Sequence, residues 1–166
     1  MLNKLNIGAG RYHIPGYIAV DLYHPKADVK APAWELPYDD NSVCAIYCSH
    51  MMEHLEGEQL DWTLKEFHRV LAPLGVMELI TPDLEKAMKY FLKSGKIGRE
   101  HALTRIFGHQ RKEGDTHYTG FWRERWEWVL HNYGFDILEI RNQASRFKVP
   151  ESHIKKSDLY VKAIKK

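Results

Sequence analysis

Hydrophobic and polar positions follow two periods along this chain, one typical of strands and the other of helices. Short apolar runs predict strands at residues 5–8, 17–21, 43–49, 76–81, 135–140 and 159–164, with a weaker one at 28–31. Helical spacing of apolar residues predicts helices at 58–71 and 122–133, and Pro82 and Asp83 open another that reaches about Leu92. Gly134 stands where a C-terminal helix cap is expected.

The order of these elements predicts the fold class. Strands that alternate with helices indicate an α/β domain whose sheet is mainly parallel. The length of 166 residues argues for one domain over residues 1–166. Residues 93–117 are polar and rich in glycine, histidine and charge, and we expect them to be either a cover over a site or a mobile insertion.

Composition excludes several classes of protein. No apolar run approaches the roughly 18 residues of a membrane span, so we expect no membrane contact. The net charge of +2 is too small to require a nucleic-acid partner. The chain begins directly with a predicted strand, so we expect no signal peptide. Cys44 and Cys48 lie about 13 Å apart in an extended strand, too far for a disulfide, which favours a reduced, cytoplasmic protein.

A glycine turn and a carboxylate are the first residues in the chain that indicate a binding site. The run at residues 5–10 is an apolar strand that enters a turn containing Gly8 and Gly10, and Asp21 ends the next strand. Glycines allow close approach of the backbone to a ligand, and an acid at the tip of the next strand can bind both hydroxyls of a ribose. Together they predict a nucleoside-containing cofactor at the carboxyl ends of the strands.

Further motifs follow in a fixed order, and they carry a resemblance to a known family. After residues 5–10 (LNIGAG) and 20–21 (VD) come LPYDDNSVCAIY at 36–47, SHMMEHL at 49–55, RVLAPLG at 69–75 and PDL at 82–84. This ordered set resembles class I S-adenosylmethionine-dependent methyltransferases, in the small branch often called methyltransferase type 11. The resemblance implies a Rossmann-like fold with helices on both faces of a mainly parallel sheet, an antiparallel last strand and a truncated N-terminus.

The resemblance also implies S-adenosylmethionine as the cofactor and assigns residues to it. The glycine turn would lie against the methionine part and Asp21 would hold the ribose hydroxyls. Leu22, Glu35 and Leu36 would border the adenine. The complete expected set of cofactor contacts is Asn6, Gly8, Ala9, Gly10, Asp21, Leu22, Glu35, Leu36, Ser49 and His50.

Some positions depart from the family pattern. Pro32 replaces the usual acid before the Leu36–Pro37 pair, and Cys44 replaces another acid. The stretch between Gly10 and Asp21 is too short for a full crossover helix, so we expect a loop or a single turn. The cofactor site would then be open, or closed by residues 93–117 or by the second subunit of a homodimer.

We therefore expect transfer of a methyl group from S-adenosylmethionine to a small-molecule acceptor, for example a sugar or nucleotide sugar, by in-line displacement. The candidate general bases are His50 and His117. The alternative is a cofactor-binding protein that is catalytically degenerate or needs a partner subunit. A nucleic-acid acceptor is disfavoured by the low net charge.

Residues 50–54 also match H-x-x-E-H, a zinc-protease pattern. That chemistry needs both histidines on an established helix, whereas His50 directly follows a strand, which argues against a protease. Another alternative is a divalent ion held by His50, Glu53 and His54, with Asp83 or His117 completing the site. The simpler interpretation involves no metal: Glu53 and His54 brace the first turn after the strand.

Overall fold

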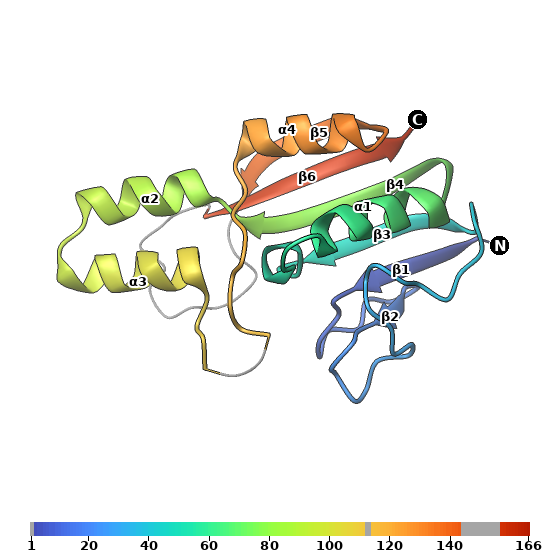
Figure 1. Cartoon of the computed structure of the whole chain (residues 1–166), viewed down its shortest axis with the longest axis horizontal. Helices are drawn as coiled ribbons and strands as arrows, with labels where there is room; N and C mark the ends of the chain where they lie inside the picture. Colours follow the sequence, from blue (N-terminus) through green and yellow to red (C-terminus); the bar gives the residue numbers. More distant parts are fainter. Residues whose placement is uncertain (1, 112–113, 144–156) are drawn as a thin grey trace.

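Six strands form one sheet in the computed structural model, which describes residues 2–111, 114–143 and 157–166 (Figure 1). The strands are β1 (Asn3–Ile7), β2 (Ile18–Val20), β3 (Val43–Ser49), β4 (Leu71–Pro82), β5 (Phe135–Gln143) and β6 (Asp158–Lys165). The helices are the 3₁₀ turn η1 (Met52–His54), α1 (Gln59–Val70), α2 (Leu84–Lys93), α3 (Lys96–Phe107) and α4 (Arg123–Asn132).

The strand order is β2-β1-β3-β4-β6-β5. Strands β2, β1, β3 and β4 pair in parallel, and β6 pairs antiparallel with both β4 and β5. The predicted α/β fold with a mainly parallel sheet and an antiparallel last strand is therefore confirmed. The weak strand expected at 28–31 is reduced to a single bridge between Val20 and Val29.

The main hydrophobic core lies on one face of the sheet. Alternate strand residues point to this face, and both α1 and α4 pack on it, in front of the strands in Figure 1. The largest fully buried side chains of the two helices are Phe67 and Trp126. The amphipathic pattern predicted over residues 58–71 thus forms α1, whose buried side chains include Leu64, Phe67 and Val70.

The opposite face of the sheet carries a smaller cluster. Tyr47, Ile80 and Tyr160 are buried there, with Ile14 and Tyr17 packed against them. Among the described residues no helix contributes to this cluster. Among the described residues, α1 and α4 thus pack on the same face of the sheet. The stretch from Gly10 to the start of β2 forms turns and loop in place of a crossover helix, as the sequence predicts.

Helices α2 and α3 pack against each other beyond the carboxyl end of β4 (Figure 1). Asp83 caps α2 by accepting a hydrogen bond from the main-chain N–H of Lys86 at 3.1 Å. Helix α3 lies within the polar segment 93–117, so this segment is partly helical. Within the described part of the chain, no helix is long and apolar enough to span a membrane.

Candidate active site

A cavity of about 490 Å³ opens at the carboxyl ends of β1, β2 and β3. Its volume falls in the usual range of small-molecule sites. The parallel sheet explains its position, because the loops that leave neighbouring parallel strands meet at one edge. The predicted site residues that line it are Asn6, Gly8, Ala9, Gly10, Asp21, Leu22, Ser49 and His50.

The glycine turn after β1 forms one wall of this cavity. Gly8 and Gly10 adopt positive φ angles of 65° and 52°, a region that favours glycine. The N–H groups of Gly8 and Ala9 donate to the carbonyl of Val20, at 2.9 and 3.2 Å. These bonds tie the turn to β2, so the backbone is set before any ligand binds.

Asp21 joins the glycine turn to the loop after β2. Its Oδ2 accepts a hydrogen bond from the N–H of Gly10 at 2.8 Å, and its Oδ1 accepts from Tyr23 and His24 at 2.9 and 2.8 Å. A carboxylate has about four acceptor positions, so the three bonds leave capacity for a ligand hydroxyl. Asp21 therefore shapes the cavity wall and also offers a polar contact within it.

Asn6 is buried at the base of the same turn. Its side-chain amide donates a hydrogen bond to the carbonyl of Tyr12 at 2.8 Å. The residue is 3% exposed and lines the cavity. This contact gives Asn6 a role in holding the turn, while its predicted contact with the cofactor stays a prediction.

The cavity wall that follows β2 in the chain is formed by other residues than the sequence predicts. Glu35 is exposed and Leu36 is buried, and neither lines the cavity, whereas residues 31–34 do. The side chain of Glu66 explains the difference, because it accepts a hydrogen bond from the N–H of Leu36 at 2.7 Å and holds that segment against α1. Trp34 is the aromatic residue of this wall, and the sequence reasoning missed it.

His50 lies at the end of β3 with a φ of 54°. Its Nε2 is 3.0 Å from Oδ2 of Asp158, and its Nδ1 is 3.2 Å from Oε1 of Glu53. Burial lowers the pKa of His50, but the hydrogen bonds to the two carboxylates outweigh this effect and raise it to about 9. In this arrangement His50 is a cation whose two ring nitrogens face carboxylates, which does not suit the predicted role of general base.

Asp158 connects His50 to α3. The carboxylate is fully buried and pairs with Arg105, which also donates hydrogen bonds to the side chain and carbonyl of Ser157 at 3.0 and 3.2 Å. Burial opposes ionisation of Asp158, but the hydrogen bond to His50 and the charge of Arg105 lower its pKa overall. The result is a buried chain of alternating charges from Glu53 through His50 and Asp158 to Arg105.

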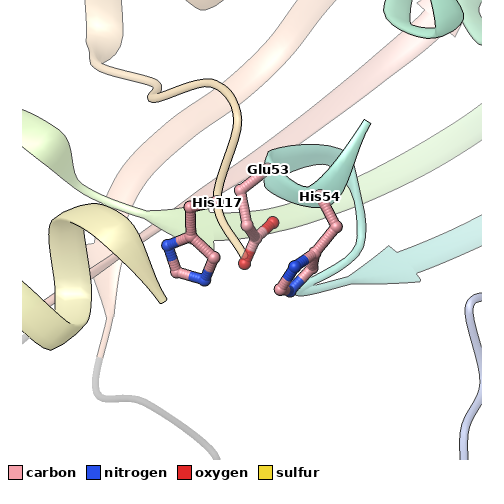
Figure 2. A group of neighbouring side chains, drawn as sticks. All are labelled: Glu53, His54 and His117. Atoms are coloured by element: carbon pink, nitrogen blue, oxygen red, sulfur yellow. The ribbon is translucent and has the colours of Figure 1, made fainter. Parts of the chain in front are cut away.

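His117, the other predicted base, lies away from the main cavity. It borders a small adjoining cavity together with Glu53, and its pKa is lowered mainly by burial. Figure 2 shows His117 and His54 on either side of the Glu53 carboxylate. Asp83, considered above as a fourth metal ligand, instead caps α2 and accepts a hydrogen bond from the side chain of Asn142 at 2.7 Å.

The chain matches the sequence profile of a family described as methyltransferase domain over residues 7–140. No curated protein matches the chain's sequence. Solved structures share its fold. An S-adenosylmethionine-dependent methyltransferase from Methanosarcina mazei aligns with a TM-score of 0.69 and 17% identity, over 98% of this chain and 92% of that chain.

Two further solved structures are similar. The S-adenosylmethionine-dependent methyltransferase from Mesorhizobium loti has a TM-score of 0.68 and 17% identity, over 99% of this chain and 91% of that one. The other is the 1,6-didemethyltoxoflavin-N1-methyltransferase from Burkholderia thailandensis, which was solved with bound 1,6-didemethyltoxoflavin and S-adenosylhomocysteine. It aligns with a TM-score of 0.62 and 16% identity, over 99% of this chain and 72% of that chain. At these identities the likeness shows a shared fold.

Proposed function

The chain belongs to the methyltransferase domain family, and from this premise we propose that it transfers the methyl group of S-adenosylmethionine to a small-molecule acceptor. The observation that carries the proposal is the meeting of the glycine turn and Asp21 in one cavity. Gly8 and Gly10, which have positive φ angles, form part of the cavity wall, and Asp21 stands at the tip of β2. This arrangement suits a nucleoside that extends into a charged amino-acid moiety.

Each of the three parts of the cofactor would lie against a different wall of the cavity. The ribose hydroxyls would donate to Asp21, and the adenine would lie toward the wall at residues 31–34, where Trp34 offers an aromatic surface. The methionine part would run along the glycine turn toward Ser49 and His50. Pro32, which replaces an acid of the family pattern, belongs to the adenine wall, so adenine recognition would depend on packing and main-chain contacts.

The reaction requires alignment more than chemical activation by the protein. The methyl group leaves an already activated sulfonium in an in-line displacement, so the cavity has to position nucleophile, methyl carbon and sulfur. The lining includes Tyr23 and Tyr118, which are 65% and 54% exposed, and the polar Glu56 and Gln59. Tyrosines and hydrogen-bonding side chains suit a hydroxyl-rich acceptor such as a sugar or nucleotide sugar.

Thermal unfolding with added ligand tests the cofactor site. At a ligand concentration one hundred times the Kd, binding should add about 2.7 kcal/mol to the free energy of unfolding. For a domain of this size that is a rise in Tm of roughly 5–10 °C. We expect this rise with S-adenosylmethionine and with S-adenosylhomocysteine, and none with adenine alone at the same concentration.

Turnover with a panel of sugars and nucleotide sugars then separates the enzyme from the alternative. A thermal shift followed by formation of S-adenosylhomocysteine with one acceptor supports the proposal. A thermal shift without turnover, restored on addition of a second protein, favours the partner-dependent alternative. No shift at millimolar cofactor would contradict cofactor binding by the chain alone.

Asp21→Ala should weaken S-adenosylmethionine binding by about 1.5–3 kcal/mol, the range for hydrogen bonds to a charged group. This corresponds to an increase in Kd of roughly 10- to 150-fold, measurable by calorimetry. Asp21→Asn should have a smaller effect, because its amide oxygen can still accept one set of main-chain bonds. Asp136→Asn, on the exposed side of β5, is the control and should leave the Kd unchanged. Unchanged affinity in a folded Asp21→Ala protein would remove Asp21 from the site.

A further inference from the structure

Three metal-ligating side chains converge beside the main cavity. Glu53 and His54 come from η1, directly after β3, and His117 comes from the loop after α3. Their ligand atoms all lie within 4.8 Å of one another. In Figure 2 the Glu53 carboxylate lies between the two imidazole rings, although His117 is distant from the other two in sequence.

Main-chain hydrogen bonds fix the two segments to each other. The carbonyl of Glu53 accepts from the N–H of Tyr118 at 2.9 Å and from that of Thr119 at 3.3 Å. The N–H of His117 donates to the carbonyl of Phe107 at 3.0 Å. The backbone therefore holds His117 opposite η1, and the convergence does not depend on the side chains alone.

The hydrogen bonds of both imidazoles determine which nitrogen can bind a cation. Nδ1 of His54 is 2.8 Å from the carbonyl oxygen of Thr116, and Nδ1 of His117 is 3.1 Å from that of Arg105. A carbonyl can only accept, so each Nδ1 carries a hydrogen, and Nε2 of the neutral ring is the nitrogen whose lone pair can bind a metal. A carbonyl bonded to the second ring nitrogen is the usual support of a metal-bound histidine.

Glu53 provides a separate indication of a cationic ligand. Its side chain is almost completely buried, with the residue 1% exposed. Oε1 faces His50, but among the residues that the structure describes Oε2 has no hydrogen-bond partner. A buried carboxylate oxygen without a donor is costly, and a bound cation would satisfy it.

We propose that Glu53, His54 and His117 form a binding site for a divalent first-row transition-metal ion. Two nitrogens and one carboxylate suit Zn²⁺, Mn²⁺, Fe²⁺ or Co²⁺, whereas Ca²⁺ and Mg²⁺ prefer oxygen ligands alone. Ligands about 2.1 Å from a shared ion are at most about 4.2 Å apart, so binding requires a small closing movement of the side chains. His50 is excluded from this set because its nitrogens face carboxylates.

The proposed metal site lies between the main cavity and the small adjoining one. His54 also lines the main cavity, while Glu53 and His117 border the small adjoining one. An ion between them would lie beside the proposed cofactor site, where it could hold an oxygen of the acceptor. This last step rests on the proposed function, whereas metal binding itself does not.

Equilibrium metal binding tests the site without reference to methyl transfer. Tag-free protein, stripped with chelator and dialysed, is titrated with Co²⁺ by visible absorption and with Zn²⁺ by elemental analysis. We expect about one tight equivalent per chain. His117→Ala and Glu53→Gln should each weaken binding at least tenfold. The control is His109→Ala, an exposed histidine of the same segment, which should bind like the unaltered protein.

The outcomes separate a metal site from a bracing contact. Metal should raise the Tm of the unaltered protein and of His109→Ala but not that of His117→Ala, which also shows whether the variant folds. Absence of a tight equivalent, or equal affinity in His117→Ala, would overturn the proposal and leave His54 and His117 as an edge-on ring contact at 4.7 Å. The thermal shift with S-adenosylmethionine is measured on the same metal-free protein, so failure of one proposal does not imply failure of the other.

Discussion

Asp158→Ala is expected to lower the free energy of unfolding by about 3–5 kcal/mol, the usual result of removing one partner from a buried ion pair. The carboxylate is fully buried and faces two cationic groups, His50 at 3.0 Å and the guanidinium of Arg105. Without it, both cations would be left in a dehydrated environment with less compensating charge. Urea unfolding at neutral pH, followed by circular dichroism, measures the change.

An exposed ion pair provides the matched control. Glu85 pairs with Lys89 one helical turn away on α2, and both side chains are more than half exposed. Glu85→Gln should leave the unfolding midpoint within error, because exposed pairs contribute little. If Asp158→Ala changed stability no more than this control, the buried chain of charges would have no part in holding the fold.

Asp158→Ala should affect cofactor binding as well as stability. Asp158 begins β6 opposite the end of β4, and through His50 it contacts the wall of the cavity. His50 has a positive φ that a non-glycine residue adopts only when its surroundings hold it there. Loss of Asp158 should therefore also weaken binding of S-adenosylmethionine in whatever fraction of the protein remains folded.

Local patterns in the sequence were sufficient for most of the fold. Helix α1 followed from the spacing of Leu64, Phe67 and their apolar neighbours, because a helix with one apolar stripe can bury it only against the sheet. The positive φ of Gly134 after α4 likewise agrees with the predicted cap. The strand at 28–31 was overestimated, because its short run pairs only through Val29.

The residues of the cavity wall were predictable where a strand end determines their position, as for Asp21 and the glycine turn. It was not predictable in the loop after Val29, where Glu66 and its neighbour on α1, Arg69, bind the main chain of Leu36 and turn it away from the cavity. A motif gives the order of residues but not which of them face inward. This is why Glu35 and Leu36 were expected at the wall and Trp34 was missed.

The charge network shows a second limit of sequence reasoning. Glu53, Arg105 and Asp158 come from three distant segments, and the pairing of Arg105 with Asp158 depends on the position of α3 at the start of β6. One local signal was present, because Asp158 is a carboxylate that directly precedes the apolar run at residues 159–161 of β6. Such a residue requires a buried partner, but the sequence alone does not identify it.

Gly8→Ala is the second change with a large expected effect. At a φ of 65° any residue with a Cβ carries a backbone cost of about 1–2 kcal/mol. A Cβ at this position would also lie 2.5 Å from Cγ and 2.6 Å from Cβ of Met51, and overpacking of this kind costs about 1–3 kcal/mol more. We expect a total loss of about 2–5 kcal/mol in the free energy of unfolding, measured by urea titration.

Gly10→Ala separates the two causes. Gly10 has a similar φ of 52°, but a Cβ there would meet no atom within 4 Å. Only the backbone cost should remain, so the difference between the two variants measures the contact with Met51. Because Met51 lines the cavity, Gly8→Ala should also abolish measurable binding of S-adenosylmethionine, with a smaller loss in Gly10→Ala. Equal stability of the two variants would mean that Met51 moves aside freely, and the close packing of the glycine turn against the residues after β3 would then not define the shape of the site.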